Sequence, residues 1–140
     1  MNALLFSLFK RVFRLSSDLV PSQLYNENTF YPRFLTDLKQ AKKEVIVESP
    51  FISSRRMSSL TSIFQKLVDR KIKVYVFTRD PQDQKTSMRL AAETAIRQLE
   101  SMGVQVVIST DNSHRKIAII DQHVLWEGSL NILSQNNSRE

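Results

Sequence analysis

Three residues with the chemistry to act on a phosphate group, His114, Lys116 and Asp121, form the pattern His-x-Lys-x4-Asp, and Gly128-Ser129-Leu130-Asn131 follows it. A histidine can attack phosphorus or carry a proton, because both of its protonation states are populated near neutral pH. A lysine close by can neutralise a nonbridging phosphate oxygen, and an asparagine amide can donate a hydrogen bond to that oxygen. The spacing of these residue types therefore indicates chemistry on a phosphodiester.

Taken one at a time, the same residues have simpler explanations. A lone histidine is more often an exposed loop residue than a catalyst, and a lone lysine is usually a solvated strand residue. Asp121 could equally form a turn ahead of Gln122. The joint spacing, followed by a Gly-Ser-x-Asn turn, favours the catalytic interpretation. Gly128 and Ser129 would then let the backbone approach the phosphate closely and offer further donors.

Alternating helix and strand patterns supply the elements that would position these groups. Apolar residues at helical spacing predict helices over residues 29–43, 53–70 and 85–102. Apolar runs and alternation predict strands over residues 44–51, 73–78, 104–109, 115–121 and 124–126. The fourth strand would place His114 at its entrance, with Lys116 and Asp121 on opposite faces. The element order predicts an α/β fold, an α/β/α sandwich in which helices flank a mixed β-sheet.

Composition narrows the classes of partner. A chain of 140 residues fits one domain, and its net charge of +6 with a pI near 9.8 favours anionic partners such as nucleic acid or acidic lipid. The chain has no cysteine, which excludes disulfides, thiolate nucleophiles and cysteine-bound metals. Two histidines argue against a zinc site built from histidine.

The first 21 residues are expected to form an apolar, basic helix and a linker, ahead of a domain over residues 22–140. Residues 1–15 are too short and too interrupted by charge to span a membrane, and their charge follows the apolar stretch, unlike a secretory signal. Two interpretations stay open, an interfacial or targeting helix with weak membrane association and a helix that docks on the domain or on a second copy. Without an export signal, we expect a location in the bacterial cytoplasm.

The pattern between residues 113 and 131 resembles the HKD motif of the phospholipase D superfamily. Upstream, Glu48-Ser49-Pro50-Phe51 is similar to the end of the first core strand of that family. Residues 22–140 resemble one half of the fold, and they are most similar to the small bacterial endonucleases that carry a single motif. The resemblance therefore implies a phospholipase D-like half domain.

The resemblance also implies a mechanism. In the family, one histidine forms a covalent phosphohistidine, and a second histidine acts as general acid and then as base for water. Because this chain has one copy of the motif, the resemblance implies a two-fold homodimer with a shared active site, to which each protomer gives His114, Lys116 and Asn131. It implies no metal and no other cofactor.

The residues around this core are less firmly assigned. Two acids are candidates for orienting His114, Asp121 of the motif itself and Glu140 after the Gly-Ser-x-Asn turn. Arg55 and Arg56 would contact the phosphate backbone, although the solvated start of a helix explains them equally well. Trp126 is expected in the core or an interface, and His123 in an exposed turn.

These observations favour a metal-independent endonuclease that cleaves DNA or RNA with little sequence specificity. A membrane-associated phospholipid phosphodiesterase is the first alternative, because it would use the same chemistry. The second alternative is a non-catalytic nucleic-acid-binding module of a larger assembly.

Overall fold

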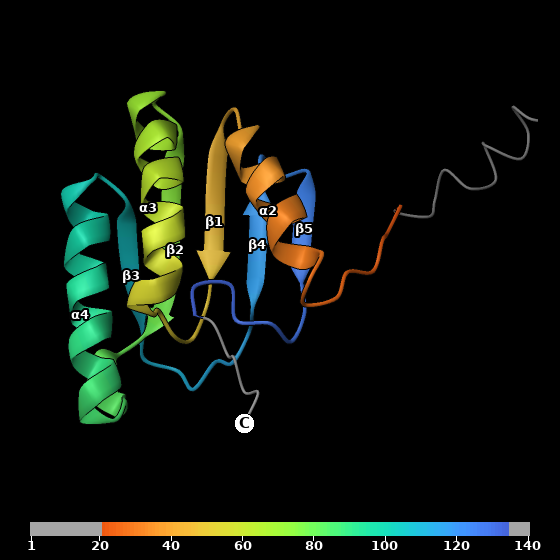
Figure 1. Cartoon of the computed structure of the whole chain (residues 1–140). Helices are drawn as coiled ribbons and strands as arrows, with labels where there is room; N and C mark the ends of the chain where they lie inside the picture. The colour runs from red at the N-terminus through yellow and green to blue at the C-terminus, as the bar shows by residue number, and fades with distance from the viewer. Residues whose placement is uncertain (1–20, 135–140) are drawn as a thin grey trace, which may run out of the picture.

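A five-stranded sheet covered by helices forms the part of the chain that the computed structural model describes, residues 21–134 (Figure 1). The strands are β1 (Glu44–Glu48), β2 (Lys73–Arg79), β3 (Gln105–Ser109), β4 (Ile117–Ile120) and β5 (Val124–Glu127). The helices are α2 (Phe30–Lys39), α3 (Ser54–Asp69) and α4 (Thr86–Ser101), with a 3₁₀ turn η1 (Pro81–Asp83) before α4.

The sheet is mixed, as expected, with the strand order β3-β2-β1-β4-β5. β1, β2 and β3 are parallel, β4 is antiparallel to β1, and β5 is antiparallel to β4. The ends of β1, β2, β3 and β5 therefore lie at the same edge of the sheet as the start of β4, and we call this the carboxyl edge. The start of β1 and the β4–β5 turn lie at the opposite edge.

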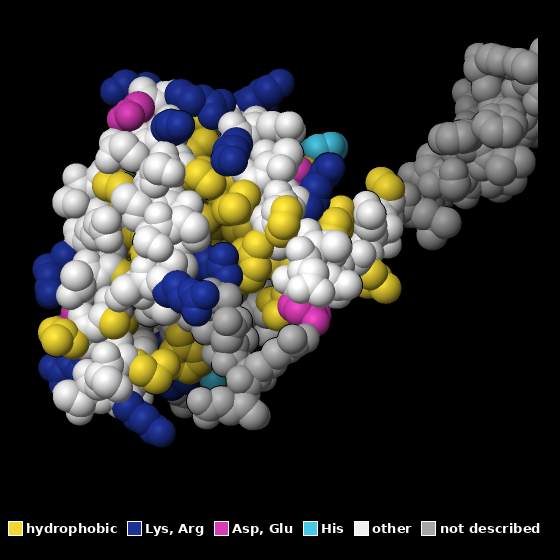
Figure 2. All heavy atoms as spheres, viewed as in Figure 1, with side chains coloured by type: hydrophobic (Ala, Val, Ile, Leu, Met, Phe, Trp, Pro, Cys, Tyr) yellow, Lys and Arg dark blue, Asp and Glu magenta, His cyan; other side chains and the backbone are white. Residues whose placement is uncertain are grey.

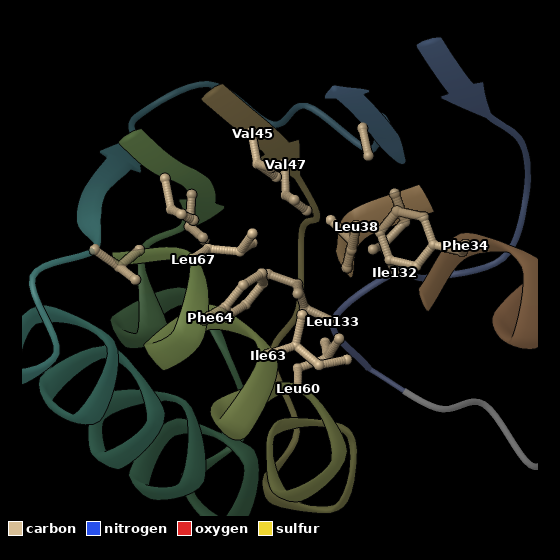
Figure 3. Close-up of a cluster of buried hydrophobic side chains, with 14 of the residues drawn as sticks. Phe34, Leu38, Val45, Val47, Leu60, Ile63, Phe64, Leu67, Ile132 and Leu133 are labelled. Atoms are coloured by element: carbon tan, nitrogen blue, oxygen red, sulfur yellow. The ribbon is translucent and has the colours of Figure 1, made fainter. Parts of the chain in front are cut away.

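The main core lies between the sheet and the helices. Val45 and Val47 of β1 are fully buried and point toward α3, where Phe64 and Leu67 meet them (Figure 3). Residues on the other face of the sheet are half-buried or exposed, and Leu125 there is 61% exposed. The helices of residues 21–134 all lie over one face (Figure 1), so the described residues form two layers of the expected sandwich.

Local sequence explains where the helices begin and end. Ser53 begins α3, because its hydroxyl accepts a hydrogen bond from the Arg56 N–H at 3.3 Å. The chain turns after α4 at Gly103, whose φ of +94° is disfavoured for residues with a side chain. α2 ends at Lys39 rather than near residue 43, because the N–H groups of residues 42–44 bond to a carboxylate instead of to the helix.

Trp126 of β5 is a core residue. Its ring packs against Tyr25, Phe30 and Phe34 with centroid distances of 4.9, 5.2 and 5.9 Å. Its indole N–H donates to the Asp37 carboxylate at 3.2 Å, which satisfies the one polar atom of the ring. These contacts hold α2 over the β5 side of the sheet.

The expected strand over residues 115–121 is shorter than the pattern predicts. β4 contains only Ile117–Ile120, with Ala118 and Ile120 buried against the helices. Lys116 lies in the loop before the strand, and Asp121 lies in the turn after it. The prediction that a strand would present both residues on opposite faces is therefore wrong.

None of the helices between residues 21 and 134 is long and apolar enough to cross a bilayer. The interfacial or docking helix expected over residues 1–15 lies outside the described residues.

Candidate active site

His114 lies at the carboxyl edge, in the loop that leads from β3 into β4, and its side chain is exposed. The Phe51 ring, beyond the end of β1, meets the imidazole edge-on with centroids 6.2 Å apart. Arg79, the last residue of β2, places Nη1 3.3 Å from His114 Nε2. Segments far apart in the sequence thus converge on one imidazole.

Arg79 is the residue of this site that the sequence analysis missed. Its Nη2 donates to Asn112 Oδ1 at 3.0 Å, and its guanidinium carbon lies 5.9 Å from the centre of the Phe51 ring. Its Nε is buried and has no hydrogen-bond partner among residues 21–134. The only sequence signal for Arg79 was its position directly after the strand predicted over residues 73–78.

Glu48 holds the loop on both sides of His114. Its Oε1 accepts a hydrogen bond from the Ser113 hydroxyl at 2.7 Å and from Arg115 Nε at 3.0 Å. Both neighbours of His114 in the chain are therefore anchored to the last residue of β1. These hydrogen bonds hold the backbone on both sides of His114 while the imidazole itself stays exposed. A catalytic group would require this kind of pre-organisation.

Lys116 lies against the same loop. Its ammonium donates to the His114 backbone carbonyl at 2.5 Å, and its own carbonyl accepts from the Gly128 N–H at 3.3 Å. The start of the Gly-Ser-x-Asn turn is thus bonded directly to the residue that carries the candidate cation. The structure brings His114, Lys116 and Gly128 together, with Ser129 exposed next to them in the chain.

Asn131 follows in the same loop and is 8% exposed. Its side-chain Oδ1 is buried without a hydrogen-bond partner among the described residues, an arrangement that costs about 1–3 kcal/mol unless a partner arrives. Its backbone carbonyl accepts a hydrogen bond from the Tyr31 hydroxyl at 2.5 Å. No hydrogen bond joins the Asn131 side chain to His114 or Lys116 within residues 21–134.

The loop that carries Asn131 is nevertheless tied to the segment beside His114. The Leu133 N–H donates to the buried Ser49 hydroxyl at 3.2 Å, and the Ser53 N–H donates to the Leu133 carbonyl at 2.9 Å. Both partners belong to the 49–53 segment, which also carries Phe51. The loop that carries Asn131 is therefore held at the carboxyl edge of the sheet.

Asp121 lies at the opposite edge of the sheet, beyond the far end of β4. Its carboxylate accepts hydrogen bonds from the backbone N–H groups of Lys42 at 3.0 Å, Lys43 at 2.7 Å and Glu44 at 3.1 Å. Partial burial raises the pKa of Asp121, but these N–H groups outweigh it, and the pKa lies below its usual value. The expectation that Asp121 could orient His114 is therefore wrong, and its role is to fasten the β4–β5 turn to the start of β1.

The two arginines at the start of α3 differ in their surroundings. The Arg56 guanidinium lies 3.3 Å from the centre of the Tyr31 ring. Burial lowers the pKa of Arg56 and raises the pKa of Tyr31, while their mutual attraction acts in the opposite direction. Arg55 is exposed. The prediction that both contact a phosphate backbone stays a prediction.

The remaining expectations concern acids and metals. Glu140, the second candidate for orienting His114, lies outside the described residues. Within residues 21–134, no three histidine, aspartate or glutamate side chains are grouped closely enough to hold a metal ion.

Comparison with known proteins places this geometry in context. A family model described as "Cardiolipin synthase, PLD-like domain" matches residues 34–140. Among solved structures, NucT from Helicobacter pylori shares the fold with a TM-score of 0.54 and 17% sequence identity, and the match covers 72% of this chain and 65% of NucT. TrmBL2, an archaeal chromatin protein described as showing a novel mode of DNA binding, gives a TM-score of 0.46 with 14% identity over 82% of this chain and 45% of TrmBL2. No curated protein matches.

Proposed function

Because this chain belongs to the phospholipase D-like domain family, as its His-x-Lys-x4-Asp pattern predicted, we propose that it hydrolyses phosphodiester bonds in DNA or RNA. The observation that carries the proposal is the exposed His114 at the carboxyl edge, with Lys116 bonded to the same loop. Nothing in the sequence resembles a module that reads bases, so cleavage is proposed to have little sequence preference.

His114 is the proposed nucleophile. Its Nε2 attacks phosphorus, a P–N bond forms, and the P–O bond to the leaving oxygen breaks. Water then attacks the phosphohistidine and releases the second product. Lys116 and the Asn131 amide lie in the two loops at this edge, from which they would stabilise the charge on the nonbridging oxygens. Removing one such donor typically slows a reaction by about 10²–10³-fold.

The leaving oxygen needs a proton, and the other histidine of this chain, His123, lies in the turn at the opposite edge. The proposed source is His114 of the partner subunit in a two-fold homodimer. That imidazole would give its proton to the leaving oxygen and then take one from the attacking water. With Asp121 bonded to the backbone of residues 42–44, Glu140 is the remaining candidate acid for Nδ1 of His114.

Positive charge supports nucleic acid as the substrate. The net charge of the chain is +6, and Lys and Arg side chains outnumber Asp and Glu on the helix-covered face shown in Figure 2. Arg55, Arg79 and Arg115 lie in the first turn of α3, at the end of β2 and in the His114 loop, all near the carboxyl edge. A polyanion bound across this edge would meet several cations beside the nucleophile.

The test is cleavage of labelled single- and double-stranded DNA and RNA by the purified protein in excess EDTA. We expect cleavage that survives EDTA and is lost in His114→Ala. His123→Ala is the matched control, because it removes the chain's other histidine from the far edge of the sheet, and it should cleave at the wild-type rate. Equal cleavage by wild type and His114→Ala would contradict the mechanism. Binding without cleavage by both would favour a non-catalytic module, and turnover of phospholipid vesicles alone would favour the lipid enzyme.

A further inference from the structure

We propose that Arg79 is a catalytic residue that occupies the attacking nitrogen of His114 in the free protein and transfers to a nonbridging phosphate oxygen when substrate binds. The inference rests on the proposed function, in which Nε2 of His114 is the nucleophile. It adds a second cation to the site, supplied by β2 rather than by the motif.

As a hydrogen bond, the contact between Arg79 and His114 requires one particular tautomer of the imidazole. A guanidinium can only donate hydrogen bonds, so the 3.3 Å contact between Arg79 Nη1 and His114 Nε2 is a hydrogen bond only when Nε2 carries no proton. The neutral imidazole then has its proton on Nδ1, the tautomer that an attack through Nε2 requires. The same contact engages the Nε2 lone pair. His114 therefore has the tautomer needed for attack, but its attacking nitrogen is blocked by Arg79.

Arg79 has the charge and the geometry of an anion-binding residue. Among residues 21–134, the salt bridges of arginine involve Arg33, Arg89 and Arg115, whereas no carboxylate lies within salt-bridge distance of Arg79. Its described polar partners are the neutral Asn112 amide and the His114 ring. A partly buried guanidinium without a counter-charge attracts an anion, and its planar fork matches two oxygens of a phosphodiester.

Substrate binding would replace His114 by a phosphate oxygen as the hydrogen-bond partner of Arg79. The phosphodiester carries a negative charge, whereas His114 is neutral in this tautomer, so the phosphate oxygen is the stronger acceptor for Arg79. As the guanidinium moves onto the oxygen, the Nε2 lone pair becomes free to form the P–N bond. The P–O bond to the leaving group breaks, and that oxygen takes its proton from His114 of the partner subunit, whose Nε2 has gained this proton from water after its own Arg79 moved onto the phosphate. Arg79 loses no proton at any step.

The first readout is the ¹⁵N NMR signal of the His114 imidazole in the full-length protein, identified by its loss in His114→Ala. We expect the Nδ1–H tautomer in the free wild type. Inorganic phosphate, added at constant ionic strength, should shift the Nε2 signal as Arg79 leaves it. Arg79→Gln should lack this response, whereas Arg97→Gln should keep it, because Arg97 is an exposed arginine of α4 remote from the carboxyl edge.

The second readout is the rate of phosphodiester cleavage. Arg79→Gln should lower kcat by about 10²–10³-fold, Arg79→Lys should recover part of that loss, and Arg97→Gln should match wild type. Circular dichroism verifies that each variant is folded. A kcat for folded Arg79→Gln within threefold of wild type would overturn the proposal.

The two readouts separate this inference from the proposed function. If the wild-type protein cleaves no phosphodiester but phosphate still shifts the His114 signal through Arg79, the proposed function fails and the Arg79 anion site stands. If phosphate leaves the His114 signal unchanged in the wild type, the Arg79 proposal fails, whatever the activity.

Discussion

Glu48 and Asp121 show how two carboxylates of similar exposure take unrelated roles according to the edge of the sheet at which they lie. Glu48 bonds to Ser113 and Arg115 and so fixes the loop around His114, whereas Asp121 bonds to the backbone of residues 42–44. The sequence pattern pointed to Asp121, because only that residue belongs to the motif. Glu48 is 65 residues from Ser113, a separation that no local pattern reveals.

Glu48→Gln tests the positioning role at the carboxyl edge. The amide cannot hold Arg115 as an ion pair, so the His114 loop should loosen and kcat/KM should fall by up to about 10²-fold, the scale expected when a catalytic group is displaced by about 1 Å. Steady-state cleavage kinetics measure the effect. Glu93→Gln is the matched control, because it breaks a 3.0 Å ion pair with Arg89 on α4, and its kcat/KM should equal that of wild type.

Asp121→Asn tests the structural role at the opposite edge. Because the pKa of Asp121 is lowered in the folded protein, its stabilising effect is present above the unfolded pKa of about 4 and is lost as pH falls through the folded pKa. We expect the variant to lose about 2 kcal/mol of unfolding free energy at pH 7, and the difference from wild type to shrink on acidification. Urea denaturation at pH 7 and pH 3 measures both. If Asp121→Asn kept the wild-type stability but no longer cleaved, the structural role would be contradicted and Asp121 would again be a candidate catalytic residue.

At the scale of elements, the β4–β5 turn places residues with side chains in a backbone conformation that favours glycine. Asp121 and Gln122 have φ values of 55° and 57°, and the His123 N–H donates to the Ile120 carbonyl at 3.0 Å, which together describe a tight hairpin turn with two left-handed residues. A side chain at such a position costs about 1 kcal/mol relative to glycine. The Gln122 amide offsets part of that cost through a 2.7 Å hydrogen bond to Glu44.

We therefore expect Gln122→Gly to raise the melting temperature, with a gain of up to about 1 kcal/mol in unfolding free energy. Gln122→Ala should be less stable than wild type, because it keeps the left-handed strain and loses the bond to Glu44. Thermal unfolding of the three proteins side by side decides the question. A glycine variant no more stable than the alanine variant would show that the turn stores no such strain.

The elements were more predictable than the site they carry. Helices and strands were predicted near their observed positions, because burial on one face imposes a 3.6-residue or two-residue period on apolar side chains. The start of β4 and the end of α2 were missed, because loop hydrogen bonds to Glu48 and Asp121 set them. The contact of Arg79 with His114 joins residues 35 apart and needs the parallel pairing of β1 with β2 before it can be anticipated.

At the scale of the whole molecule, the decisive question is the number of chains in one active site. The described residues hold His114 at the carboxyl edge and His123 at the far one, and the chain spans 65% of the length of NucT. Light scattering on the active protein should give about twice the 16.2 kDa of the chain. Cleavage at full rate by a species of 16.2 kDa would contradict the shared site, while leaving His114 as nucleophile to be tested by its own variant.

The packing of Trp126 beneath α2 has a practical consequence, because it is the only tryptophan in the sequence. The wavelength of its fluorescence emission depends on whether the aromatic cluster around it excludes water. It pairs with Ala118 of β4. Intrinsic fluorescence excited at the red edge of the protein spectrum therefore reports the docking of α2 on the sheet without an added dye.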